Sequence, residues 1–380
     1  MDPRPRLATF TLQLPLICSL LCLPCQASNE RGTGQTSADR SPANHLLGHQ
    51  ETTQQPTEAP DAQSPAKDPD PLFPVLEHGK WGYMDKTGKI VIKPEYYDAF
   101  PFKEGMARIQ PFAVLLSKAI RVQFIDKSGK ILDMSTIYSY AEDFSEGLAL
   151  VAIPGERGLG YVDTTGKIVI PQDDSWQMAQ SFHEGLAAIK QGGQWGYVDK
   201  LGKTVIAPQF SEAYRFSEGL AAVKNGGKWG YIDETGKTVV ALQYETAYQH
   251  VEGLAAVKEG GKWGFIDKTG KMVIQPKFDD AYGFSEGLVE VKSGGKWGFS
   301  DKNGELVIAP RYDAVHAHFD GLAGVKEGGK WGYLDKAGKM VIPAQFDAAA
   351  GFWEGLALVR VGKKFGYIDK TGKYVWAPAK

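Results

Sequence analysis

Nine aspartates recur along this sequence, and each is followed three places later by a glycine. Carboxylates at a regular spacing could bind a metal ion or transfer protons. In an Asp-x-x-Gly segment, however, the aspartate caps a turn and the glycine closes it at positive φ. No D-x-D-x-D-G calcium loop is present. We therefore expect nine turn-forming aspartates: Asp85, Asp126, Asp163, Asp199, Asp233, Asp267, Asp301, Asp335 and Asp369.

Histidines offer a second possible chemistry. His316 and His318 would share one face of an extended segment and could form a metal pair. His318 and His250, however, stand where other copies of the pattern carry phenylalanine, so aromatic packing is the expected role. Nothing completes a triad with His183, and no serine or cysteine has nucleophile-elbow context. The phenylalanines are Phe102, Phe144, Phe182, Phe216 and Phe284.

Glycine-rich runs such as Gly260-Gly261-Lys262 lack the strand–helix context and spacing of a phosphate-binding loop, so we expect hairpin turns. The sequence thus predicts no catalytic residue, no metal and no cofactor, and hence a protein that is not an enzyme. The alternative is a hydrolase with its site in the irregular N-terminal copies, where Asp173-Asp174-Ser175-Trp176 breaks the pattern.

An acid–glycine–apolar triplet occurs eight times. We expect each carboxylate to accept hydrogen bonds from backbone amides of the connecting segments. The alternative is an acidic stripe that binds a basic partner, and its candidate residues are Glu218, Glu252 and Glu286. The connector tyrosines Tyr214, Tyr248 and Tyr282 are further candidates, because with nearby lysines they could contact glycans or acidic chains. The eight acids are Glu104, Glu146, Glu184, Glu218, Glu252, Glu286, Asp320 and Glu354.

Residues 1–27 are typical of a cleaved secretory signal peptide. Arg4 and Arg6 precede an apolar run from Leu7 to Pro24, and Ala27 ends a signal-peptidase site. An uncleaved membrane anchor is the alternative. We expect a periplasmic or secreted bacterial protein with no membrane span after cleavage.

All three cysteines, Cys18, Cys22 and Cys25, lie in this leader. Cleavage leaves no thiol for a disulfide, a zinc site or a nucleophile. Lipid anchoring at Cys25 is disfavoured, because the residues before it make a poor lipoprotein signal. The formal net charge of −2 gives no field that would attract nucleic acid.

Residues 28–71 are rich in Ser, Thr, Gln, Pro and acidic residues, with almost nothing to bury. Such a segment cannot offset its own ordering entropy, so it is predicted to be a disordered tether.

Residues 72–380 repeat one pattern nine times: a Trp-Gly pair, an aromatic residue, an apolar residue and Asp. Val122 and Leu159 replace the tryptophan in two degenerate copies, and Phe365 replaces it in the last. This pattern resembles the WG-repeat family, and the resemblance implies a repeat architecture far more than an activity. The residues expected to build each copy are Trp81, Gly82, Trp195, Gly196, Trp229, Gly230, Trp263, Gly264, Trp297, Gly298, Trp331, Gly332, Asp267 and Gly270.

Each copy is predicted to form a three-stranded antiparallel meander, as at 254–258, 262–267 and 271–274. The following connector is expected to carry a short helical turn near 279–281. Alternation places Trp263 and Phe265 on one face of the middle strand, with Gly264 and Ile266 on the other. We expect the tryptophan of one meander to lie over the glycine of its neighbour.

The fold class is therefore all-β, with about nine meanders stacked as an open superhelix or solenoid. A closed or spiral β-propeller-like ring is the alternative. The open stack is favoured because a propeller blade normally has four strands and about 40 or more residues.

Stacked copies give long surfaces that suit extended partners. The predicted function is an extracytoplasmic scaffold that binds a protein or a cell-envelope polysaccharide. A hydrolase and a purely structural spacer are the competing predictions.

Overall fold

The regular elements of the computed structural model are β-strands, and the structure describes residues 68–112, 121–132 and 138–377. The expected leader and residues 28–67 of the expected tether lie outside the described residues. The described residues belong to one compact unit, residues 59–380. Their strands form eight separate sheets, which we call blades.

The first blade has five strands and the other seven have four, each strand hydrogen-bonded to the next along the chain. Blade 1 contains β1 (Phe73–Glu77), β2 (Lys80–Met84), β3 (Ile90–Ala99), β4 (Met106–Pro111) and β5 (Gln123–Asp126), and blade 2 contains β6 (Tyr140–Ala141), β7 (Leu148–Ala152), β8 (Leu159–Asp163) and β9 (Ile168–Asp173). Blade 3 contains β10 (Trp176–Ala179), β11 (Leu186–Gln191), β12 (Gln194–Asp199) and β13 (Thr204–Phe210). Blade 4 contains β14 (Glu212–Ser217), β15 (Leu220–Asn225), β16 (Lys228–Asp233) and β17 (Thr238–Tyr244).

Blade 5 contains β18 (Thr246–Ala247), β19 (Leu254–Glu259), β20 (Lys262–Asp267) and β21 (Met272–Phe278), and blade 6 contains β22 (Asp280–Ala281), β23 (Val289–Ser293), β24 (Lys296–Ser300) and β25 (Leu306–Tyr312). Blade 7 contains β26 (Ala314–Phe319), β27 (Leu322–Glu327), β28 (Lys330–Asp335) and β29 (Met340–Phe346). Blade 8 contains β30 (Ala348–Ala349), β31 (Leu356–Val361), β32 (Lys364–Asp369) and β33 (Tyr374–Trp376).

The predicted three-stranded meander is wrong by one strand. The segment expected to be a connector with a helical turn near 279–281 instead supplies the first strand of the next blade, as β22 does by pairing with β23. This strand is two residues long in several blades. A strand that short carries no alternating pattern, which is why the sequence does not reveal it.

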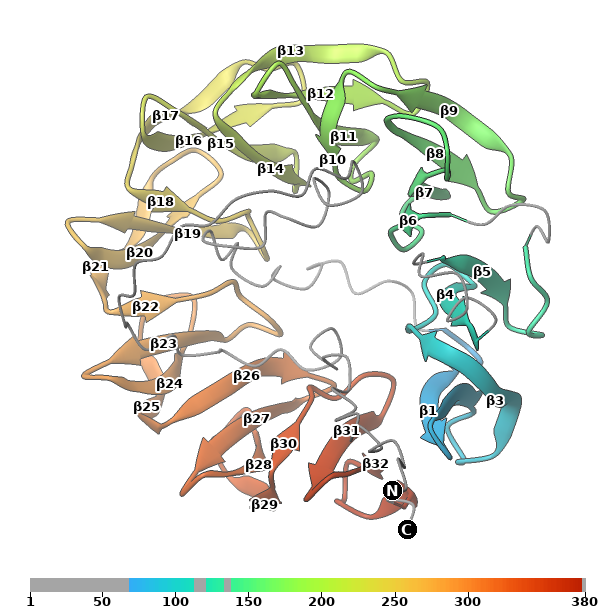
Figure 1. Cartoon of the computed structure of the whole chain (residues 1–380). Coiled ribbons are helices and arrows are strands. Elements are labelled where there is room, and N and C mark those ends of the chain that lie inside the picture. Colours follow the sequence, from blue (N-terminus) through green and yellow to red (C-terminus); the bar gives the residue numbers. More distant parts are fainter. Residues whose placement is uncertain (1–67, 113–120, 133–137, 378–380) are drawn as a thin grey trace, which may run out of the picture. The chain divides into compact units, whose positions relative to one another are not determined.

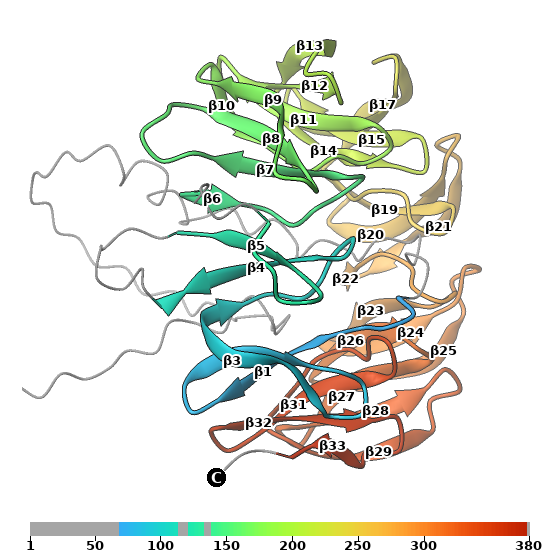
Figure 2. The same ribbon diagram turned by 90° about the vertical axis from the view of Figure 1, so that its right-hand side faces the viewer.

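The blades form a closed eight-bladed β-propeller, so the predicted open superhelix is wrong and the alternative ring is the observed fold. Figure 1 shows the blades following one another around the ring, with β9, β13, β17 and β21 on its outer rim. In both views β1 lies beside β31 and β32 (Figures 1 and 2). The fourth strand removes the reason for preferring an open stack.

Nine copies of the pattern make eight blades because β3 serves two copies. This strand is ten residues long. Its Tyr96 pairs with Trp81 of the first copy on one side and with Pro111 of the second copy on the other. The first two copies therefore share one sheet.

The ring closes through side chains and not through a shared sheet, since blade 1 holds only N-terminal strands and blade 8 only C-terminal strands. The Phe73 ring lies edge-on to the rings of Trp353 and Tyr367, with centroids 5.4 and 5.7 Å away. The Tyr367 hydroxyl donates to the carbonyl oxygen of Pro74 at 2.9 Å. Because Pro74 has no N–H and its carbonyl is engaged, this free edge of β1 is a poor template for another strand.

The predicted alternation of faces is confirmed. Trp263 and Phe265 of β20 pack into the core shared with the following blade. Ile266 packs into the core shared with the preceding blade, which contains Trp229 and Tyr231. Each blade is thus held between two neighbours. The core consists of the spaces between blades and of one further cluster between the two copies that share the first blade.

The Trp-Gly glycine has a different role from the one predicted. A Cβ on Gly264 would lie 2.5 Å from the Ile274 carbonyl oxygen and 2.8 Å from the Pro276 nitrogen. The cause is a bulge in β21, where the register shifts between Ile274 and Phe278 and the backbone approaches β20. It is the turn glycine Gly270 that approaches a neighbouring blade, since a Cβ on Gly270 would lie 3.0 Å from Val240 Cγ2.

His250 and His318 occupy aromatic core positions, as predicted. Their rings lie edge-on to Tyr231 and Phe299, with both centroid distances 4.7 Å. Phe284 makes the same contact with Phe265 at 5.1 Å. Neither ring nitrogen of either histidine has a hydrogen-bond partner among the described residues. Burial lowers the pKa of both histidines, that of His318 to about 4.

Replacing Gly264 with valine should lower the free energy of unfolding by about 2–4 kcal/mol, because the backbone of β21 leaves no room for a Cβ. Thermal unfolding measures the change. Gln275→Val is the matched control, since Gln275 lies on the neighbouring strand β21 with its side chain exposed. A Gly264→Val variant that melts with the wild type would contradict the close approach.

The melting temperature should fall as the pH drops from about 6.5 towards about 4, partly through His318. Below pH 6.5 the unfolded chain binds a proton on this ring that the folded chain takes up only near pH 4, so stability is lost in that window. His318→Phe should reduce the fall, and Phe284→His should increase it. Equal pH slopes for all three proteins would exclude this role of His318.

Candidate functional site

The repeated aspartates bond to their own turns. Asp267 Oδ1 accepts from the Thr269 amide at 2.9 Å, the Thr269 hydroxyl at 2.6 Å and the Lys271 amide at 3.1 Å. The Thr269 hydroxyl is the main reason that the pKa of Asp267 lies below its usual value. Within the described ranges, no three or more His, Cys, Asp or Glu side chains gather as a metal site.

The acid–glycine pairs form tight hairpin turns, between the first two strands of blades 2 to 8 and, for Glu104-Gly105, between β3 and β4 of blade 1. Ser217 pairs with Leu220, and the two residues between them, Glu218 and Gly219, have φ of 57° and 84°. Two positive φ values define a type I′ turn, whose first position normally holds Asn, Asp or Gly. All eight acids of the triplets have positive φ. A repeated glutamate in this strained conformation indicates that its carboxylate has a specific use.

Seven of these eight carboxylates accept backbone N–H groups from the next acid–glycine turn around the ring. Glu184 accepts from the Glu218 amide at 2.6 Å and from the Gly219 amide at 2.8 Å. We call this series of bonds the acid–amide ladder. Its other links run from Glu104 to Glu146 and Gly147, Glu146 to Glu184 and Gly185, Glu218 to Gly253, Glu252 to Gly287, Glu286 to Gly321 and Asp320 to Gly355.

The ladder continues across the closure of the ring. Glu354 Oε1 accepts from the Asp68 amide of the first copy at 3.1 Å. Lysines reinforce other links from the next Asp-x-x-Gly turn: Lys268 lies 3.1 Å from Glu218 Oε2, Lys302 lies 3.1 Å from Glu252 and Lys336 lies 3.1 Å from Glu286. A basic partner would have to compete with these bonds, and partner binding by Glu218, Glu252 and Glu286 stays a prediction.

The three connector tyrosines lie against tryptophans of their own blades. Ring centroids are 5.0 Å apart for Tyr214 and Trp229, and 5.0 Å apart for Tyr282 and Trp297, with both pairs stacked. Tyr248 lies 4.7 Å from Trp263. Burial raises the pKa of Tyr214 and that of Tyr282 to about 12. These rings are half-buried, and their contact with a partner stays a prediction.

One cavity of about 440 Å³ lies on the outer rim, along β9. It is shallow and open, and we call it the rim cleft. Residues from the second and third blades line it: Arg157, Ile170, Pro171, Gln172, Asp173, Asp174, Trp176, Leu201 and Gly202. The expected site of a hydrolase, Asp173-Asp174-Ser175-Trp176, thus does border a cavity.

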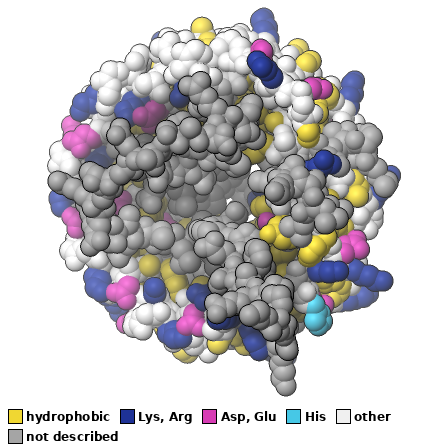
Figure 3. Space-filling view, viewed as in Figure 1, with side chains coloured by type: hydrophobic (Ala, Val, Ile, Leu, Met, Phe, Trp, Pro, Cys, Tyr) yellow, Lys and Arg dark blue, Asp and Glu magenta, His cyan; other side chains and the backbone are white. Residues whose placement is uncertain are grey.

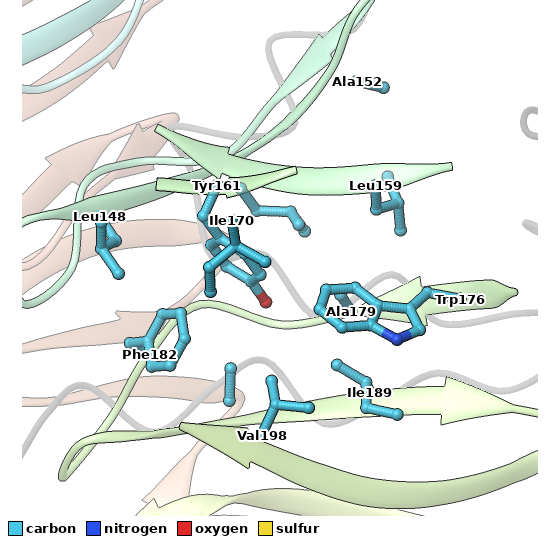
Figure 4. Packing of buried hydrophobic residues seen from close by; sticks show 12 residues of the cluster. Leu148, Ala152, Leu159, Tyr161, Ile170, Trp176, Ala179, Phe182, Ile189 and Val198 are labelled. Carbon is cyan, nitrogen blue, oxygen red and sulfur yellow. The ribbon is translucent and has the colours of Figure 1, made fainter. Parts of the chain in front are cut away.

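The rim cleft exists because the second blade departs from the other copies. Trp195 pairs with Phe210 in a regular copy, whereas here Leu159 pairs with Asp173. Trp176 lies in the space that the smaller Leu159 leaves, and Figure 4 shows its ring between Leu159 and Ile189. The chain advances six residues from Ile170 to Trp176, whereas a regular copy advances four, from Ile206 to Phe210. The two extra residues form the bulging wall of the cleft.

Hydrogen bonds fix the opposite wall, the hairpin 153–158. The side chain of Gln172 donates to Glu156 at 2.6 Å and accepts from the Ile153 amide at 3.1 Å. A Cβ on Gly158 would lie 2.3 Å from the backbone of Asp173, so the hairpin and the bulge are in direct contact. The cleft is therefore preformed.

Leu201 is a lining residue that the sequence pattern alone did not single out. It is 84% exposed, and it stands in an Asp-x-x-Gly turn where six other copies carry a threonine or serine. Those hydroxyls donate to the turn aspartate, as Thr235 does to Asp233 at 2.6 Å. Comparing the nine turns would have revealed Leu201, but its place in one cleft with Ile170 depends on how the two blades meet.

The rim cleft presents two carboxylates, one guanidinium, one amide and an apolar surface. Its lining, drawn from the described part of the chain, contains no histidine, cysteine or serine. Asp173 Oδ1 is engaged by the Ser175 amide and hydroxyl at 2.8 and 2.5 Å, which closes a local turn. Figure 3 shows basic and acidic side chains interspersed around the visible face. In the part of the chain that the structure describes, no helix is both long and apolar enough to cross a membrane.

Three solved structures that match the chain do so at low sequence identity. A crystal structure described as that of the eukaryotic initiation factor has a TM-score of 0.58 and 13% identity, covering 83% of this chain and 96% of its own. BamB from Moraxella catarrhalis has a TM-score of 0.38 and 13% identity, with 81% and 91% covered. Virginiamycin B lyase from Staphylococcus aureus has a TM-score of 0.34 and 13% identity, and the match covers 62% of this chain and 92% of the lyase chain. The first of these supports the fold alone.

No curated protein sequence matches the chain. The model of the family described as WG containing repeat matches in eight copies, at residues 81–110, 124–153, 160–195, 195–229, 229–263, 263–297, 297–331 and 331–365. These matches cover more than half of the sequence, and the chain therefore belongs to the WG containing repeat family.

Proposed function

We propose that this chain is a non-catalytic scaffold that holds a protein partner on the surface of its propeller, outside the cytoplasm. The observation that carries the proposal is a contrast among the copies. The repeated polar side chains bond to their own turns and to neighbouring blades, whereas three departures from the pattern gather around the rim cleft. A repeat protein gains a local binding site where its copies differ.

A hydrolase is the second candidate, and the position of Asp173 and Asp174 in the rim cleft is what favours it. Paired carboxylates can serve as acid and base when their environments differ. Asp173 is instead bonded into a turn, and Asp174 is exposed. Binding explains the cleft with fewer assumptions than catalysis does.

The proposed location rests on residues 1–27, whose basic start, apolar run and small residues at the end suit a secretory leader. Export would also suit a mature chain without cysteine.

Photo-crosslinking from the rim tests the scaffold function. A photoreactive amino acid at Leu201, Val239, Val273 or Val341, which are all exposed, should give a defined protein adduct in the native host from at least one position. The unirradiated cells are the control. Absence of any protein adduct from all positions, together with substrate turnover that Asp174→Ala abolishes, would replace the scaffold with the hydrolase. A polysaccharide adduct would show instead that the partner is a polysaccharide and not a protein.

N-terminal sequencing tests the proposed location. The chain recovered from its native host should begin at Ser28, because Ala27 ends the expected cleavage site. It should also appear outside the cytoplasmic fraction. Ala27→Arg, which places a large charged residue at the cleavage site, should leave the leader attached. A wild-type chain that keeps residues 1–27 and stays in the cytoplasm would contradict export.

A further inference from the structure

We propose that the rim cleft binds an extended peptide segment of the partner, with an apolar side chain seated on Leu201 and a basic side chain held by Asp173 and Asp174. This inference rests on the scaffold function, to which it adds the site and the chemistry of the partner.

Three departures from the repeat meet in this one place. The hairpin of the second blade is lengthened, since Val151 pairs with Gly160 across eight residues, whereas Val223 pairs with Gly230 across six. The segment after β9 carries two extra residues. The turn of the third blade carries Leu201 in place of a hydroxyl residue. Each departure affects a different loop, yet all three line the rim cleft.

The fold does not need Leu201. Its side chain is 84% exposed, so it contributes little to the core. The turn also lacks the hydroxyl bond that threonine gives in the equivalent turn of the next blade, 2.6 Å from Thr235 to Asp233. An exposed leucine that weakens its own turn is explained if it contacts an apolar group of a partner. Ile170 and Pro171 provide the adjoining apolar surface.

The cleft is also acidic. Asp173 and Asp174 line it together with one cation, Arg157. Glu156 adds a third carboxylate nearby, because it accepts a hydrogen bond from the lining residue Gln172. Carboxylates at the rim attract a lysine or arginine side chain and set the direction in which a peptide lies. The five N–H donors of Arg157 suit the backbone carbonyls of an extended segment.

A peptide fits this surface better than a small molecule, because the cleft is shallow and open along β9. Pro171 lies within β9 and removes an N–H from that strand, so a partner cannot simply add a strand to its edge. Recognition through side chains in the cleft is the remaining mode.

Fluorescence anisotropy with the full chain tests the proposal. The probes are labelled nonapeptides of glycine and serine with one leucine and, one to four residues away, a lysine, a glutamate or a further serine. Leucine–lysine probes should bind at least about tenfold more tightly than leucine–glutamate probes, and the difference should shrink at high salt.

Two variants of the cleft should each weaken binding of the leucine–lysine probes by about tenfold or more. Leu201→Thr removes the apolar contact. It should keep the fold, because the threonine hydroxyl can donate to Asp199 as Thr235 donates to Asp233. The double variant Asp173→Asn, Asp174→Asn removes the charge. Thr235→Leu is the matched control, since it places leucine in the equivalent turn of the next blade, outside the cleft.

Equal binding of lysine and glutamate probes, or unchanged binding by Leu201→Thr, would overturn the proposal. The scaffold function is judged separately, because crosslinks from Val239, Val273 or Val341 would still support it. A crosslink from Leu201 that competes with the leucine–lysine probe would support both.

Discussion

The bond between a turn carboxylate and the backbone amides of the next turn is the interaction on which the ring depends. Each acid of the ladder has positive φ, which costs about 1–2 kcal/mol for a residue with a Cβ. A hydrogen bond to a charged group contributes about 1.5–3 kcal/mol in general, enough to offset that strain. Glu184 makes two such bonds, to Glu218 and Gly219. The ladder thus links blades that share no sheet.

The same interaction completes the circle. Glu354 bonds to Asp68 where the first copy lacks its acid–glycine turn. Phe73, Trp353 and Tyr367 fill the space beside it. Because no strand is exchanged between the first and last blades, closure relies on contacts of this kind. Pro74 protects the unpaired edge of β1.

The copies act as controls for one another. Positions that recur, such as Gly264 and Asp267, have a local steric or hydrogen-bonding reason that returns from copy to copy. His318 shows a tolerated exception, because an imidazole keeps the edge-on contact of the phenylalanine that it replaces. The rim cleft shows another kind of exception. The large Trp176 fills the space that the small Leu159 leaves, and lengthened loops form a new surface beside them. Differences of this second kind are where a repeat protein can acquire a specific partner.

By itself the sequence determined the repeat, the all-β class, the Asp-x-x-Gly turns and the alternating faces of Trp263 and Ile266, because these follow from local periodicity and turn chemistry. Only the tertiary structure decided the number of strands, the closure and the role of Gly264. A two-residue strand such as β22 exists through pairing with β23 and has no signal of its own. Closure depends on contacts between the two ends of the chain, and the rim cleft on the meeting of two blades, so neither could be read from one copy.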